Sequence, residues 1–70
     1  MGKNTSKMVE LAEYPSLMEA EVVKGMLETN GIEAMVTEQY NPYGQAYAYS
    51  KVIVMDYDLE AAKRLLESEQ

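Results

Sequence analysis

The chain contains no cysteine, histidine, phenylalanine or tryptophan among its 70 residues. Without cysteine it can form neither a disulfide nor a thiolate-bound zinc site. Without histidine it lacks the commonest general base, a common metal ligand and the side chain that titrates near neutral pH. These absences remove the usual catalytic and metal-binding designs, so we expect a non-enzymatic protein with no cofactor.

Basic charge is also scarce, because six Lys and Arg residues stand against twelve Asp and Glu and give a net charge of −6. The basic residues are scattered, so they form no cluster that would attract a nucleic acid or an anionic membrane. No apolar run reaches transmembrane length, and the first residues lack the apolar segment of a signal peptide. We expect a soluble cytoplasmic protein whose partners are neither nucleic acids nor membranes.

The length indicates one small domain with a limited hydrophobic core. We expect a disordered N-terminal tail at residues 1–6 and a single α+β domain at residues 7–70. Self-association would bury more apolar surface, and the six methionines suit an adaptable contact. The composition therefore favours a homo-oligomer.

The first half of the chain predicts a strand followed by a helix. Residues 7–14 are typical of a strand that ends at a proline. Ser16 and Glu19 then have the spacing of a capping box, which predicts a helix that runs to about Thr29. Asn30 and Gly31 are a good stop signal, since glycine accepts the left-handed conformation that ends many helices.

The second half predicts a hairpin and another helix. Residues 32–40 and 46–55 read as strands, and residues 41–44 have the preferred residues of a type I turn. Asp58 is expected to cap a final helix at residues 59–68, whose leucines and alanines make one apolar face.

This order of elements, β-α-β-β-α, predicts a split β-α-β arrangement. The fold class is α+β, with a three-stranded antiparallel sheet and two helices on one face. It corresponds to a ferredoxin-like fold that lacks its fourth strand, which leaves the first strand as an exposed edge that invites pairing.

Four of the six tyrosines lie in residues 40–49, at the tip of the predicted hairpin. A three-residue loop with a bulge would pair Asn41 with Gln45 and so set the register of the two strands. The small and aliphatic side chains would then lie under the helices, in the facing pairs Val36–Ser50, Ala34–Val52 and Ile32–Val54.

The alternate side chains of the hairpin would form the open face of the sheet, as an ordinary half-exposed strand or as a contact surface. We favour a contact surface, since tyrosine is enriched at interfaces and apolar patches on small proteins mark contacts. A base-stacking platform is disfavoured, because Lys51 is the only nearby base. The candidate interaction surface comprises Met35, Tyr43, Tyr47, Tyr49, Lys51 and Ile53.

The first helix carries more apolar surface than one core needs. Met18, Val22, Gly25 and Met26 form a second stripe, away from the side expected to face the sheet. A glycine inside a helix costs about 1 kcal/mol relative to alanine, which suggests close approach of another backbone. The second helix could pack against this stripe, or the stripe could be a dimer contact.

No motif for metal binding or catalysis emerges. Asp56, Asp58, Glu60 and Glu67 have part of the spacing of a calcium loop, but Ala61 stands where that loop needs glycine. No serine has a histidine partner, and no glycine-rich loop precedes a helix to hold phosphate. We expect neither a metal site nor an enzyme.

Two runs of sequence point to a known family. EAEVVKGMLETNGIEAMV, from Glu19 to Val36, precedes the hairpin, and KVIVMDYDLEAAKRLLES, from Lys51 to Ser68, follows it. Together they resemble a family of unknown function labelled putative prokaryotic signal-transducing protein, over about residues 8–67. The resemblance implies a βαββα domain of the ferredoxin-like, nitrogen-regulatory-protein-like type and a role in signalling. It carries over no catalytic or metal-binding residue.

Two hypotheses for function follow. The first is a small non-enzymatic regulatory or adaptor module that acts through protein–protein contacts and forms homo-oligomers. The alternative is a sensor of small molecules such as nucleotides that uses the hairpin at residues 40–50 as a binding loop.

Overall fold

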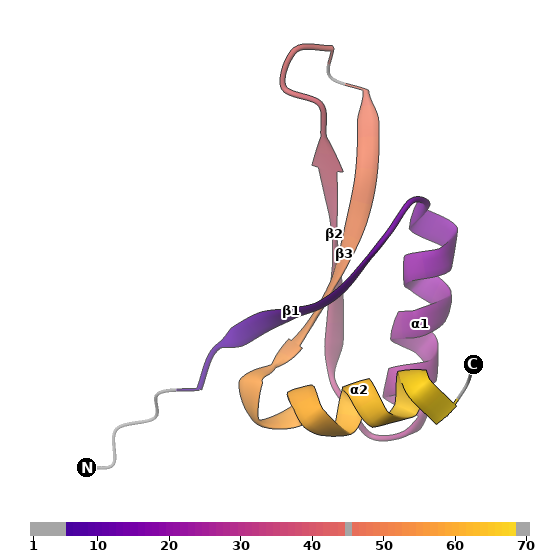
Figure 1. The fold of residues 1–70 in the computed structure, drawn as a ribbon, viewed down its shortest axis with the longest axis vertical. Helices are drawn as coiled ribbons and strands as arrows, with labels where there is room; N and C mark the ends of the chain where they lie inside the picture. Colours follow the sequence, from indigo (N-terminus) through magenta and orange to yellow (C-terminus); the bar gives the residue numbers. More distant parts are fainter. Residues whose placement is uncertain (1–5, 45, 69–70) are drawn as a thin grey trace.

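The computed structural model of the chain describes residues 6–44 and 46–68. Apart from Ser6, the predicted tail lies outside the described residues, as does Gln45 with its predicted pairing. The elements follow the predicted order (Figure 1). They are β1 (Met8–Tyr14), α1 (Leu17–Thr29), β2 (Ala34–Tyr40), β3 (Tyr47–Met55), the short 3-10 helix η1 (Asp56–Asp58) and α2 (Leu59–Ser68).

The start of α1 is made by the predicted cap. The Ser16 hydroxyl accepts a hydrogen bond from the backbone N–H of Glu19 at 3.1 Å, so one of the free donors of the first turn is satisfied. Ser16 itself is extended, with φ −133° and ψ 149°, and the helix begins at Leu17. Because Pro15 cannot continue β1 into regular pairing, the chain turns directly from the strand into the cap.

The end of α1 is a Schellman motif. Ile32 donates its N–H to the carbonyl of Leu27 at 2.9 Å, and Gly31 donates to the carbonyl of Glu28 at 3.0 Å. Gly31 has φ +84°, the left-handed conformation that this motif needs. Leu27 and Ile32 are both buried, so the motif also turns the chain back toward the sheet. For this reason β2 begins at Ala34 and not at the predicted residue 32.

The strand order is β1-β3-β2, with both neighbours antiparallel to the central β3. This confirms the predicted α+β fold and the position of β1 at one edge of the sheet, with β2 at the other edge. Residues of both helices join one core cluster with the sheet, so the two helices cover the same face. Beyond them, the β2–β3 hairpin projects away from the body of the domain (Figure 1).

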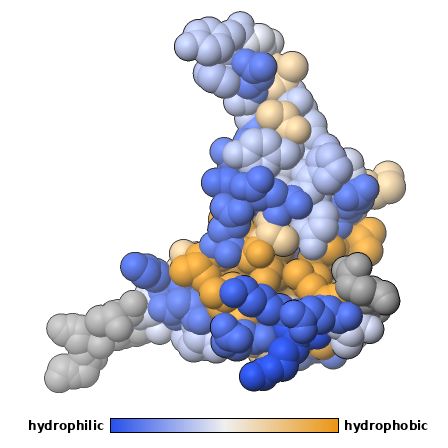
Figure 2. Space-filling view, in the orientation of Figure 1, coloured by the Kyte–Doolittle hydropathy of each residue, from blue (hydrophilic) through white to orange (hydrophobic). Residues whose placement is uncertain are grey.

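The core is small and aliphatic, as expected for a chain of this length. Figure 2 shows apolar residues gathered in the body of the domain and a mostly polar projecting hairpin. Side chains of α1, α2, the α1–β2 connection, β2 and β3 meet in the core. Its buried members are Ala20, Leu27, Ile32, Ala34, Val52, Val54 and Ala62.

The hairpin register differs from the predicted one by two residues. Ala34 pairs with Val54 and not with Val52, and Val36 pairs with Val52 and not with Ser50. One residue is added in the turn, where Asn41 donates its N–H to the Ala46 carbonyl at 2.8 Å. A second is added by a bulge in β3, before the Tyr40–Tyr47 pair. Since the strand period is two residues, the combined shift keeps Ala34, Val36, Val52 and Val54 on the predicted helix-covered face.

The last helix also begins differently. The sequence predicts Asp58 as the cap of α2, but this residue lies in η1, which runs straight into α2. Leu59 donates its backbone N–H to the carbonyl of Asp56 and already has helical backbone angles, φ −59° and ψ −45°. A preceding helical turn supplies partners that a side-chain cap would otherwise provide.

The two glycines of the α1 region predict opposite effects of one substitution. Gly31→Ala should lower the free energy of unfolding by about 1–2 kcal/mol, because an L side chain strains the left-handed conformation. Gly25→Ala should raise it by about 1 kcal/mol, because an added Cβ meets nothing within 4 Å in a helix interior. Urea unfolding of both variants beside the wild type measures the difference. Destabilisation by Gly25→Ala would contradict the open surroundings of Gly25.

Candidate functional site

The face of the sheet opposite the helices is the first candidate surface. Ser50, Val52 and Val54 of β3 are fully buried under the helices, so the alternate residues of β3 point the other way. Their partners on β1 and β2 lie on that same side. We call this surface the open face; it comprises Met8, Glu10, Glu13, Met35, Thr37, Gln39, Tyr49, Lys51, Ile53 and Met55.

The lower half of the open face is apolar. Met8 pairs with Met55, and Ile53 pairs with Met35. Met35 is 50 % exposed, whereas Ile53 and Met55 are half-buried by their neighbours. Among the described residues no helix covers this group, so its methionine and isoleucine side chains are accessible to another molecule.

Three charged side chains lie close together on the open face, Glu10, Glu13 and Lys51, and we call them the charged row. Lys51 stands between Glu13 on β1 and Thr37 on β2, and its Nζ lies 3.6 Å from Oε1 of Glu10. A hydrogen bond with the nearby Glu10 carboxyl raises the pKa of Glu13, desolvation and the charge of Glu10 raise it further, and Lys51 opposes the shift. The row therefore holds two acids around one base.

Of the six predicted surface residues, the structure brings Met35, Tyr49, Lys51 and Ile53 together on the open face. Tyr43 stands apart in the turn, where it is 97 % exposed and its backbone N–H bonds the Asn41 side chain at 2.9 Å. Whether these residues contact a partner stays a prediction.

Tyr47 does not lie on the open face, contrary to the prediction. The bulge in β3 pairs it with Tyr40, and their rings meet edge to face with centroids 6.0 Å apart. Its hydroxyl shares a hydrogen bond of 2.6 Å with the fully buried Ser50 hydroxyl on the helix-covered side. The extra residue in β3 reverses the side-chain alternation, which moves Tyr47 to the other face.

A signal for this role of Tyr47 is present in the sequence. Ser50 alternates with Val52 and Val54 along β3, so its hydroxyl is a polar group at a core position. A buried hydroxyl needs a hydrogen-bond partner, and a nearby tyrosine can supply one. The bulge that aims Tyr47 at Ser50 has no equally clear signal.

The stripe on α1 is the second candidate surface. Met18 is 77 % exposed and Val22 is 66 % exposed, so α2 does not cover them and that interpretation is wrong for these two residues. Gly25 also faces open space, because a Cβ added there would meet nothing within 4 Å. Met26 differs from the other three, since it packs against the core. The dimer-contact interpretation of the stripe stays a prediction.

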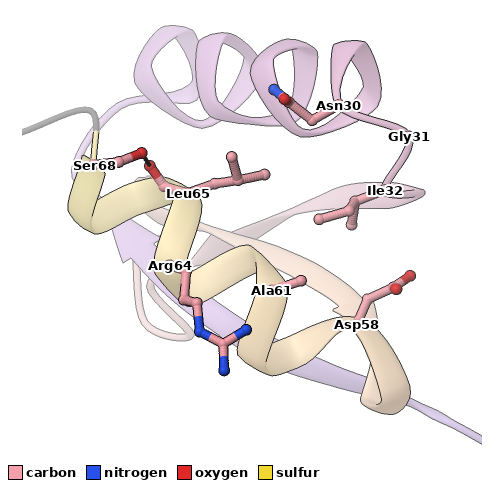
Figure 3. A pocket seen from close by; sticks show the side chains of 8 residues that line it. All are labelled: Asn30, Gly31, Ile32, Asp58, Ala61, Arg64, Leu65 and Ser68. Carbon is pink, nitrogen blue, oxygen red and sulfur yellow. Dashed lines mark hydrogen bonds between the residues drawn. The ribbon is translucent and has the colours of Figure 1, made fainter.

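A shallow groove of about 600 Å³ lies between α2 and the α1–β2 connection (Figure 3). Ile32 and Leu65 provide its apolar part, and Asp58 and Arg64 add opposite charges to its lining. In Figure 3 the Arg64 side chain points away from Ile32 and Leu65. Within residues 6–44 and 46–68, Arg64 makes no ion pair. The lining residues are Asn30, Gly31, Ile32, Asp58, Ala61, Arg64, Leu65 and Ser68.

Sequence reasoning missed this groove, because it joins residues that lie about thirty positions apart. None of its lining residues belongs to residues 40–50, the hairpin that the sequence suggested as a binding loop. The one sequence signal for this groove was Arg64, a basic residue of the last helix to which the sequence assigned no role.

The acidic residues do not gather into a metal site. In the part of the chain that the structure describes, no three Asp or Glu side chains are placed to hold one metal ion. Asp56 and Asp58 lie in η1, and Glu60 and Glu67 follow in α2. A helical turn in place of a loop separates these carboxylates, unlike the calcium loop that their spacing resembles.

Comparison with protein families is consistent with this geometry. The model of the family described as "Putative prokaryotic signal transducing protein" matches residues 8–70, which is nearly the whole chain. The chain belongs to this family. No curated protein and no solved structure matches it with statistical significance.

Membership in this family confirms the resemblance drawn from the two sequence runs, and it associates the chain with signalling. In the described residues, no helix is long and apolar enough to cross a membrane.

The charged row of the open face predicts a dependence of stability on pH. A carboxyl group whose pKa is raised by folding stabilises the fold below its ordinary pKa, here 4.5, and this contribution is lost as pH rises through the raised value. Relative to Glu13→Gln, the wild type should therefore lose stability as pH increases through this range. Urea unfolding midpoints from about pH 3.5 to pH 7 measure the difference.

Glu21→Gln, which removes the same charge from α1, is the control for net charge. A constant difference between wild type and Glu13→Gln at every pH would show that the Glu10–Glu13 contact does not form in solution.

Proposed function

We propose that the chain is a cytoplasmic, non-enzymatic regulatory or adaptor module that acts through protein–protein contacts and forms homo-oligomers. The open face is the surface that it offers to a partner protein. The observation that supports this proposal is the exposure of a contiguous apolar group on a face that no helix of the described chain covers.

The chemistry of the open face suits a protein partner. Methionine side chains adapt to different shapes, and Met8, Met35 and Met55 all lie here. Tyr49 adds an aromatic ring with a polar end, a residue type enriched in interfaces. Lys51 and the two acids beside it would set the orientation of a partner more than its affinity.

The proposal leaves out a nucleic acid, because one lysine among acids cannot neutralise a phosphate backbone. It also leaves out catalysis, because the sequence has neither a cysteine nucleophile nor a histidine to activate a serine or threonine. A regulatory module needs neither, since its effect depends on which protein it contacts.

The test is capture of a partner from a lysate of the native host, quantified by mass spectrometry. The double variant Met35→Ser/Tyr49→Ser should recover the specific partner roughly tenfold less well, because a few central residues dominate an interface. The double variant Met18→Ser/Val22→Ser, on the equally exposed α1 stripe, is the matched control and should keep the partner. Far-UV circular dichroism and thermal melting of both variants check the fold.

Loss of the partner by the α1 variant alone would move the contact to the stripe and contradict the open face. Retention by both variants would place the contact on neither surface.

A sensor of small molecules is the second candidate, and the groove is the observation that favours it. Its volume is in the range of ligand pockets, and its lining offers Arg64 for the carboxylate or phosphate of a metabolite or nucleotide and Ile32 and Leu65 for an apolar part. The hairpin at residues 40–50 would then be remote from the ligand, unlike in the hypothesis drawn from the sequence.

A thermal-shift screen with nucleotides and metabolites tests this candidate. A specific ligand at about one hundred times its Kd adds about 2.7 kcal/mol, a rise of roughly 10–20 °C for a domain of this size. Arg64→Gln should abolish the shift, whereas Tyr43→Ser in the hairpin turn should keep it. A shift lost in the Tyr43 variant alone would assign the ligand to the hairpin.

A further inference from the structure

The outer edge of β2 is the least protected part of this fold. β2 stands at one end of the strand order, so among the described residues no strand pairs with its outer side. All seven residues from Ala34 to Tyr40 keep the strand conformation. Half of their backbone groups point away from β3, and such unpaired groups are a template for another strand.

The opposite edge, β1, which the sequence led us to expect as the edge that invites pairing, is better protected than β2 by a bulge, a second charge and a proline. β1 contains an extra residue in a bulge between Glu10 and Ala12, which interrupts a regular edge. It carries two charges, Glu10 and Glu13, and Pro15 follows its end. Bulges, charges and prolines are the devices that keep natural edges from pairing.

β2 has neither a bulge nor a proline of its own, and it carries one charge. Its sequence, AMVTEQY, contains no proline, glycine or lysine, and the bulge of the hairpin lies in β3. Its single charge is Glu38, whose carboxylate accepts a hydrogen bond of 2.6 Å from the Tyr40 hydroxyl. The edge is therefore regular, uncharged at its centre and open.

We propose that β2 pairs with β2 of a second copy of this chain, antiparallel about a two-fold axis at Thr37. The two sheets then form one continuous sheet of six strands, three from each copy. This proposal names the surface of the homo-oligomer and so rests on that part of the proposed function.

The side chains of β2 suit this arrangement. With Thr37 on the axis all seven residues find partners, and Thr37 faces its own copy, a favourable cross-strand pair. Glu38 lies opposite Val36 of the second copy, and Met35 lies opposite Gln39. No like charges face each other, although each chain carries a net charge of −6. Like charges facing each other at the centre of β2 would have destabilised its pairing with a second copy.

The pairing leaves the open face free. The open faces of the two copies become one surface, and Met35 and Thr37 of both lie near its middle. A partner protein would then meet twice the area that one copy offers, without a change in the fold of either copy.

A single cysteine tests the proposal, because the chain has none of its own. In the proposed pairing, Thr37→Cys places two sulfur atoms directly opposite each other, with Cα atoms about 4.5–5.5 Å apart, a separation that a disulfide spans. Glu13→Cys is the matched control, since Glu13 and Thr37 are the two neighbours of Lys51, on opposite edges of the sheet. Light scattering over a range of concentrations first establishes the oligomeric state of the wild type.

The expected result is a dimer in which mild oxidation links most of the Thr37→Cys chains and few of the Glu13→Cys chains. A dimer in which Thr37→Cys does not link, or in which Glu13→Cys links better, would overturn β2 pairing and leave homo-oligomer formation standing. A strict monomer at all concentrations would overturn both.

Two further measurements keep the test independent of the cysteine variant. In the wild type, backbone amide exchange in β2 should slow as protein concentration rises, and unchanged exchange in a dimer would overturn the proposal.

Thr37→Lys places like charges opposite each other and should weaken the dimer roughly two- to fivefold, whereas Gln39→Lys, opposite Met35, should weaken it less. A dimer that Gln39→Lys weakens more than Thr37→Lys would contradict a two-fold axis at Thr37.

Discussion

The burial of one side of β3 is the constraint on which the rest of this structure depends. β3 is the central strand, and its alternate residues Ser50, Val52 and Val54 are completely buried beneath the helices. Both helices of the described residues lie on this one face of the sheet. The other side of β3 therefore stays open, and four of the six predicted surface residues, Met35, Tyr49, Lys51 and Ile53, lie on that side.

A second consequence is that a polar side chain, Ser50, lies at the border of the core and needs a hydrogen-bond partner. Ser50 is fully buried, and the Tyr47 hydroxyl satisfies it at the point where the helices end and the hairpin projects. Farther along β2, the exposed Tyr40 hydroxyl donates a hydrogen bond to Glu38, which raises the pKa of Tyr40. Two of the hairpin tyrosines thus have hydroxyl partners within the chain, so a large aromatic content in the hairpin is not by itself evidence of a ligand.

The surfaces differ in what they could do. The open face combines apolar side chains with the charged row. The α1 stripe exposes Met18 and Val22 and leaves space at Gly25. The groove is lined by the apolar Ile32 and Leu65 and by the charged Asp58 and Arg64. The open face fits the signalling association of the family best, because regulation by contact needs an accessible and adaptable surface. The proposed pairing of β2 with a second copy would give a larger assembly and leave that face accessible.

Local signals in the sequence were enough for the order of elements, the Ser16 cap, the Gly31 stop and the choice of which hairpin residues lie under the helices. These features depend on the chemistry of neighbouring residues and on a strand period of two, both of which can be read along the chain. The tertiary structure alone decided the register, the place of Tyr47 and the groove. A bulge costs little locally and is selected by packing such as the Tyr47–Ser50 bond, and a groove exists only once α2 lies beside the α1–β2 connection.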